Sequence, residues 1–120
     1  MSDSSGSVKV TYLDVEAARC EIRQAAHELA RRRPEIERVL LFGSLATGRA
    51  APGSDGDLLV ILKESDRAFL DRIPLYTPLG CKVGLDVFPY TRAEVESMAE
   101  NSLVARAVAE GVEIYPAKLE

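Results

Sequence analysis

The sequence predicts an α/β (α+β) fold in which a small mixed β-sheet is packed by helices on one side. Helical and extended hydrophobic patterns alternate along the chain, as expected of such a domain. Residues Leu58–Leu62 form an unbroken apolar run that is typical of a central strand buried on both faces. Thr91–Glu94 matches a capping box, which predicts a helix directly after a strand.

The length of 120 residues fits one domain, which we expect over residues 13–120. Residues 1–12 are expected to be a disordered tail, because the first residues are rich in Ser, Gly and Asp. The first helix is expected to begin after Asp14, a suitable N-cap, and to end before Pro34. Its core-facing residues recur at helical spacing, and they are Val15, Ala18, Ile22, Ala25, Ala26 and Leu29.

A first strand is expected over Ile36–Phe42, which ends in three apolar residues. Gly43 and Ser44 then form a turn. A short helix over Leu45–Arg49 and a loop over Ala50–Ser54 follow, because the loop contains proline and glycine. The second strand is expected over residues 57–62.

The segment 65–79 is the least regular, since Pro74 and Pro78 interrupt a helical pattern that starts near Ser65. A third strand is expected over residues 82–88, with Pro89 ending it.

The C-terminal part is expected to contain two helices and a short strand. The capping box predicts a helix through Met98, and a second helix over Leu103–Glu110 is ended by Gly111. Val112–Tyr115 is the expected last strand.

Composition narrows the classes of function. The net charge of −4 argues against a protein that grips a long nucleic acid, which normally needs a basic face. No apolar run approaches the length of about 18 residues that a membrane helix needs. The two cysteines, Cys20 and Cys81, are far apart in a chain without a secretory signal pattern, so we expect free thiols and a cytoplasmic location.

Three acidic residues occupy unexpected positions. Asp55 and Asp57 stand at the entrance of an apolar strand and, being two residues apart, project to the same face of it. Asp86 lies inside the third strand between two apolar residues. If the two strands are neighbours, the three carboxylates converge, and their mutual repulsion calls for a cation. Carboxylate oxygens suit Mg²⁺ or Mn²⁺, and Mg²⁺ commonly also binds substrate phosphates.

Gly43 and Ser44 supply the complementary chemistry. A strand that turns into a helix at Gly-Ser offers backbone N–H groups, a hydroxyl and a helix N-terminus, which together suit a phosphate. Glycine also lets a phosphate approach the backbone closely. One end of the sheet is therefore expected to combine phosphate donors with metal-binding carboxylates.

Each of these features also has a purely structural interpretation. Asp55 and Asp57 then belong to a solvated loop beside a strand, and Asp86 points outward from a half-exposed strand. Gly43 and Ser44 then form an ordinary turn in which the serine caps a helix. Arg49 can reach a bound phosphate, but it can equally be an exposed side chain near a loop.

The motif from Gly43-Ser44 to Ser54-Asp55-Gly56-Asp57-Leu58-Leu59-Val60 resembles the G-S…S-D-x-D-L-x-V signature of the DNA polymerase β-like nucleotidyltransferase superfamily. The chain is most similar to its minimal nucleotidyltransferases (MNT proteins), and Asp86 stands where that family has its third carboxylate. The resemblance implies a nucleotidyltransferase fold. One departure is Gly56, where the family usually has an apolar residue, and glycine loosens the start of a strand.

The resemblance also implies roles for these residues. Asp55 and Asp57 would bridge two Mg²⁺ ions, and Asp86 would bind the catalytic ion and help to activate the attacking hydroxyl. Gly43, Ser44 and Arg49 would hold the phosphates of a nucleoside triphosphate. The expected reaction moves a nucleoside monophosphate, AMP from ATP, to a hydroxyl acceptor.

The chain is short for the acceptor-binding domain of larger relatives, so we expect a partner chain or a homodimer. Minimal nucleotidyltransferases commonly accompany a helical HEPN toxin, and the resemblance implies an antitoxin that adds AMP to a tyrosine of it. Two alternatives remain open. One is a non-catalytic module that neutralises a partner protein by contact, and the other is nucleotidylation of a small molecule.

Overall fold

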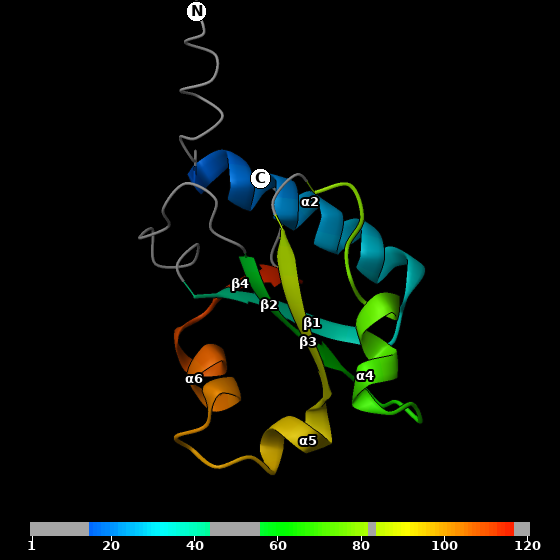
Figure 1. The fold of residues 1–120 in the computed structure, drawn as a ribbon, viewed down its shortest axis with the longest axis vertical. Helices are drawn as coiled ribbons and strands as arrows, with labels where there is room; N and C mark the ends of the chain where they lie inside the picture. The colour runs from blue at the N-terminus through cyan, green and yellow to red at the C-terminus, as the bar shows by residue number, and fades with distance from the viewer. Residues whose placement is uncertain (1–14, 44–55, 82–83, 117–120) are drawn as a thin grey trace, which may run out of the picture.

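A four-stranded mixed sheet forms the centre of the protein in the computed structural model, which describes residues 15–43, 56–81 and 84–116 (Figure 1). The strand order is β3-β2-β1-β4, in which β1 is antiparallel to both β2 and β4, and β2 is parallel to β3. The elements are α2 (Val15–Arg32), β1 (Ile36–Phe42), β2 (Gly56–Leu62), α4 (Phe69–Arg72), η1 (Ile73–Leu75), β3 (Leu85–Thr91), α5 (Arg92–Glu96), α6 (Leu103–Glu110) and β4 (Val112–Tyr115). The expected mixed sheet with packed helices is confirmed.

Helices cover both faces of the sheet, so the expectation of helices on one side is wrong (Figure 1). Alternate residues of β2 pack in two separate clusters. Leu58, Val60 and Leu62 pack with α2, whereas Leu59 and Ile61 pack with Val104 and Ala107 of α6. Since residues 58–62 are apolar at every position, both faces of β2 need a covering layer.

The third strand runs through Pro89, so the expectation that this proline ends it is wrong. The strand covers Leu85–Thr91, with Pro89 paired to Val60 in register. Proline is tolerated here because β3 is an edge strand, so its missing N–H does not remove a hydrogen bond between two central strands. The Pro89 carbonyl oxygen accepts a hydrogen bond from Arg72 Nη1 at 3.1 Å.

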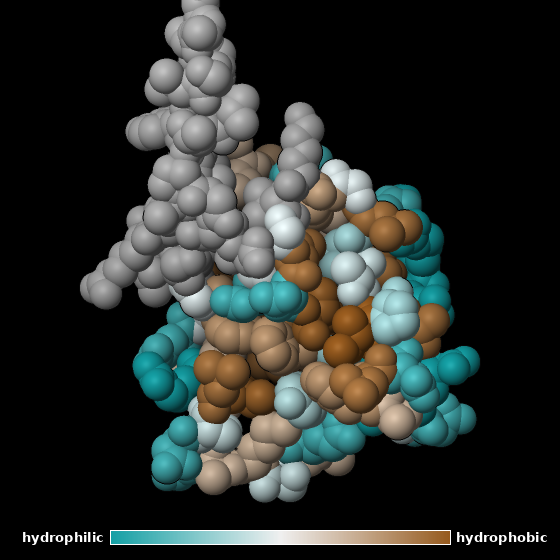
Figure 2. Space-filling model, viewed as in Figure 1, coloured by the Kyte–Doolittle hydropathy of each residue, from teal (hydrophilic) through white to brown (hydrophobic). Residues whose placement is uncertain are grey.

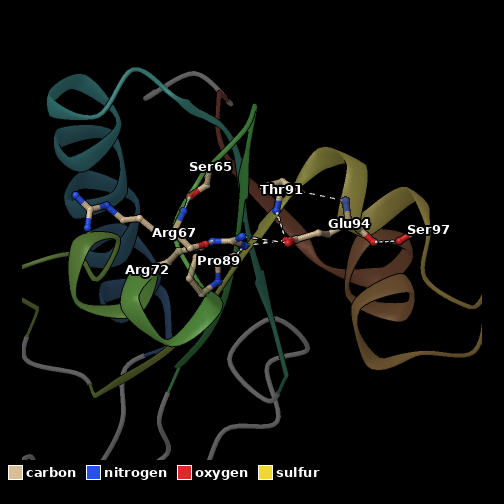
Figure 3. Close-up of polar contacts among 7 residues, drawn as sticks. All are labelled: Ser65, Arg67, Arg72, Pro89, Thr91, Glu94 and Ser97. Carbon is tan, nitrogen blue, oxygen red and sulfur yellow. Dashed lines mark hydrogen bonds and ion pairs between the residues drawn. The ribbon is translucent and has the colours of Figure 1, made fainter.

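An ion pair between Arg72 and Glu94 fastens α4 to the start of α5 (Figure 3). Arg72 Nη1 and Nη2 donate to the two carboxylate oxygens of Glu94 at 2.7 and 3.1 Å. The Arg72 side chain is only 6 % exposed, and its Nε donates to the Arg67 carbonyl oxygen at 2.9 Å. The helix around Arg72 begins at Phe69, later than the expected start near Ser65, and a 3-10 turn containing Pro74 follows it.

The C-terminal elements agree closely with the sequence patterns. Thr91 and Glu94 form the predicted capping box at the start of α5, although that helix ends at Glu96 rather than continuing through Met98. The bounds of β1, α6 and β4 are those predicted. Gly111 follows α6 with φ −71°, and a Cβ there would lie 2.5 Å from the Ala107 carbonyl oxygen, so close approach favours glycine at this position.

Several expectations concern residues outside the described ranges. They are the tail over residues 1–12, the Asp14 cap, the short helix over Leu45–Arg49 and the loop over Ala50–Ser54. Within the described ranges, no helix has the length and apolar character needed to cross a membrane.

Candidate nucleotidyl-transfer site

Two of the three expected carboxylates lie side by side at one end of the sheet. Asp57 of β2 and Asp86 of β3 are register partners in the parallel ladder. Partners in such a ladder project from the same face of the sheet. Asp57 is half-buried and Asp86 is exposed. The strand adjacency on which their convergence depends is therefore confirmed.

The face that carries these carboxylates is the face that α6 covers further along the strands. Asp57 alternates with Leu58 and shares its side of β2 with Leu59, which packs in the α6 cluster. Asp86 likewise shares its side of β3 with Phe88, which packs against the same cluster. The two aspartates thus lie at the end of this sheet face that α6 does not cover. The residues further along the strands on the same face are apolar.

Gly43 brings the end of β1 against Asp57. Phe42, the last residue of β1, pairs with Asp57 in the antiparallel ladder. Gly43 has φ +80°, and a Cβ built on it would lie 2.4 Å from Asp57 Oδ2. Glycine is favoured here because an L side chain is strained at this φ, and a Cβ would also require the Asp57 carboxylate to move.

Gly56 does not disrupt the start of β2, although it lacks the apolar side chain usual in similar motifs. It is buried and pairs with Leu85 in the β2–β3 ladder. Its N–H donates to the Gly84 carbonyl oxygen at 2.8 Å. The backbone just before Asp57 is therefore fixed to the backbone just before Asp86.

The remaining predicted site residues, Ser44, Arg49 and Asp55, lie outside the described residues. Within residues 15–43, 56–81 and 84–116, no group of three or more acidic, His or Cys side chains could hold a metal ion. Asp57 and Asp86 alone nevertheless fit part of a divalent cation site, since they are hard oxygen donors of like charge on one sheet face.

Comparison with known proteins assigns the class. The sequence profile described as "Polymerase beta, Nucleotidyltransferase" matches residues 24–118. The chain belongs to this nucleotidyltransferase family, whose members generally use a divalent metal ion and a nucleoside triphosphate. No match is found among curated protein sequences.

The fold is similar to that of a protein from Sulfolobus solfataricus that has been proposed to be a nucleotidyltransferase. The TM-score is 0.61 at 22 % sequence identity, over 82 % of this chain and 80 % of that one. At this identity the likeness concerns the fold alone. It supports the arrangement of a small mixed sheet with packed helices.

Two residues next to the site, Phe42 and Phe88, were not identified from the sequence. Their rings lie 5.6 Å apart between centroids on the face that carries the aspartates. The signal for them is the twofold alternation along each strand. Phe88 follows Asp86 by two residues, and Phe42 directly precedes Gly43.

Proposed function

We propose that the chain is a Mg²⁺-dependent nucleotidyltransferase that moves AMP from ATP to a hydroxyl acceptor. The observation that carries the proposal is the register pairing of Asp57 with Asp86 on one sheet face, with the Gly43 turn against Asp57. Two carboxylates on one sheet face supply the hard oxygen ligands that a divalent cation such as Mg²⁺ prefers. Membership of the family supplies the general activity.

The reaction requires little covalent chemistry from the protein. The acceptor oxygen forms a bond to the α-phosphorus, the bond from that phosphorus to the bridging oxygen breaks, and pyrophosphate leaves with the electron pair. Asp86 is the group that we assign to accept the proton of the hydroxyl. Asp57, on the central strand, would hold a divalent ion that neutralises the α-phosphate, so most of the effect of the site is positioning.

Asp55, Asp57 and Asp86 are the residues that would hold two Mg²⁺ ions, with Mn²⁺ as a substitute. When bound, the ions would stabilise negative charge on the attacking and leaving oxygens. Gly43 and Ser44 would hold the terminal phosphates through backbone N–H groups and the serine hydroxyl. Arg49 would add a charged donor to the same phosphates.

The acceptor that we propose is a protein hydroxyl, following the similarity to minimal nucleotidyltransferases. In that group the partner is commonly a helical HEPN-type protein, and the acceptor is then one of its tyrosines. The chain would then act as the antitoxin of the pair, in the cytoplasm. A homodimer is the alternative way to complete the site.

Mass spectrometry of the chain with ATP, Mg²⁺ and its co-purifying partner tests this proposal. We expect the partner, or the chain itself in a homodimer, to gain the mass of one AMP, together with release of one pyrophosphate. The gain should disappear when Mg²⁺ is chelated and when Asp86→Asn replaces the wild type.

The matched control is Asp71→Asn, which removes an exposed carboxylate from α4, away from the site. It should leave the AMP gain unchanged. Tight binding and inhibition of the partner without any mass gain, unaffected by Asp86→Asn, would instead indicate a module that acts by contact. That outcome would refute the enzymatic proposal.

A further inference from the structure

A cavity of about 240 Å³ lies between the sheet and α6, on the face that carries the two aspartates. Its floor is formed by side chains from three strands, Phe42 of β1, Leu59 of β2, and Phe88 and Tyr90 of β3. Val104 and Ala107 of α6 form the facing wall. Figure 2 shows hydrophobic side chains gathered around α6 and the adjoining part of the sheet.

The cavity floor begins one side-chain spacing from the aspartates. Phe42 is the cross-strand partner of Asp57, and Leu59 follows Asp57 by two residues on the same face. Phe88 follows Asp86 in the same way. Two residues of a strand span about 6.6 Å. A group held in the cavity can therefore extend a short substituent to the carboxylates.

The lining selects for a hydrocarbon body rather than a polar one. Among the described residues, none that lines the cavity carries a charge. The lining side chains carry two hydroxyl groups, of Tyr90 and Ser102, and the Ser102 oxygen already accepts the Ala105 N–H at 3.0 Å as the cap of α6. A nucleobase would bury several polar edge atoms with few partners, at a cost of about 1–3 kcal/mol for each unsatisfied group.

The cavity volume suits one ring. An apolar protein cavity of about 150 Å³ is known to bind benzene, so about 240 Å³ admits a six-membered ring with a small substituent. We infer that this cavity holds the apolar body of the hydroxyl acceptor, a ring-sized hydrocarbon group whose hydroxyl is directed to Asp57 and Asp86. The inference rests on the proposed function and places part of the acceptor site in this chain.

Binding of a small probe tests the cavity without any transfer reaction. We expect 4-methylphenol, titrated into the full chain without nucleotide or metal, to shift the NMR signals of the Leu103, Val104 and Ala107 methyl groups in a saturable way. Glycerol should not shift them. The methyl signals of Leu70 and Leu79, which are both 74 % exposed elsewhere on the chain, should not respond to either compound.

Variants at the cavity mouth give the second measurement. Leu103 lines the cavity but is 58 % exposed, so Leu103→Glu adds a charge there without disturbing the core. We expect it to weaken 4-methylphenol binding by about tenfold or more, because a ring beside a charged group loses its apolar environment. Leu70→Glu is the matched control and should leave binding unchanged. Ala107→Phe should abolish binding by filling the cavity, provided that the variant remains folded.

Nucleotide binding separates the possible occupants. Affinity for ATP and Mg²⁺ should be the same in Leu103→Glu as in the wild type. A parallel loss of ATP affinity would identify the nucleobase as the occupant and overturn the inference. Absence of a saturable response to 4-methylphenol would overturn it as well, while AMP transfer, if observed, would leave the proposed function standing.

A transfer assay links the cavity to the reaction. With ATP and Mg²⁺, we expect 4-methylphenol to be nucleotidylated at least about tenfold faster than glycerol at equal concentration, and Leu103→Glu to remove that preference. Equal rates in the wild type would contradict the acceptor role of the cavity. If the wild type binds no ATP with Mg²⁺, the proposed function itself fails, whatever the cavity binds.

Discussion

The two ends of the sheet arrange charge in opposite ways. Where β2 and β3 begin, Asp57 and Asp86 are register partners of the same sign. Where β3 passes into α5, Arg72 and Glu94 are of opposite sign and form a bidentate pair. The pair at the second end stabilises the fold, whereas we propose that the two carboxylates at the first end serve to bind a ligand.

The largest expected effect is at the aspartate end. Asp57→Asn should lower the rate of nucleotidyl transfer by about 10³-fold or more, because a charged ligand to the metal and phosphate is lost. Its free energy of unfolding should change by less than about 1 kcal/mol, since the substitution keeps the shape of the side chain. Pyrophosphate release and chemical denaturation measure the two quantities.

The opposite outcome is expected at the ion-pair end. Arg72→Met should lower the free energy of unfolding by about 2 kcal/mol, because Glu94 and the carbonyl oxygens of Pro89 and Arg67 lose their donor. The affinity for ATP should remain that of the wild type. An undisturbed unfolding transition, or a loss of ATP binding in a folded variant, would remove the distinction between the two ends.

Two glycines with positive φ sharpen the comparison. Gly43→Ala should cost about 1–2 kcal/mol of stability from the left-handed backbone and should also weaken ATP binding, because its Cβ meets Asp57. Gly80 has φ +87° with nothing within 4 Å of a Cβ, so Gly80→Ala should show only the cost of the left-handed backbone and no steric contact. Equal effects of the two variants on ATP binding would show that the approach of Gly43 to Asp57 has no functional role.

The smallest expected effect is the pH dependence of the ion pair. Hydrogen bonds from Arg72, together with those at Thr91, hold the pKa of Glu94 at about 2, below its usual value of 4.5. Because the folded-state pKa is depressed, the pair stabilises the protein above about pH 4.5, and that stability is lost as the pH falls towards 2. With Glu94 42 % exposed, the difference should be about 1 kcal/mol.

Denaturation of Glu94→Gln across the same range measures this contribution. The stability curve of the variant should be flatter than that of the wild type between pH 4.5 and 2. Parallel curves would mean that other carboxylates dominate acid unfolding.

Local patterns were sufficient to predict most elements of the fold. The apolar run ending at Phe42, the capping box at Thr91 and the glycine after α6 each depend on a few neighbouring residues. Pro89 misled the prediction because its effect depends on whether the strand is at an edge, which is a tertiary property. The apolar run Leu58–Leu62 already indicated that both sheet faces are covered, although periodicity does not show which helix packs on which face.

In the candidate site, too, local features could be predicted from the sequence, whereas contacts between distant residues could not. The local signals at Gly43 and Asp57 could be read from the sequence, because an apolar strand that opens with an acid is unusual. The pairing of Asp57 with Asp86 joins residues 29 positions apart in a parallel ladder, so it needed the structure. The cavity at Phe42, Leu59 and Phe88 also depends on three strands meeting and could not be inferred from any one of them.

Calorimetry of ATP binding in the presence of Mg²⁺ tests the central claim most directly. The wild type and Arg72→Met should bind ATP with the same affinity, whereas Asp57→Asn and Asp86→Asn should each bind it at least about tenfold more weakly. Removing Mg²⁺ should abolish the difference between wild type and the aspartate variants. Unchanged, metal-dependent ATP binding in both aspartate variants would show that these carboxylates do not form the nucleotide site.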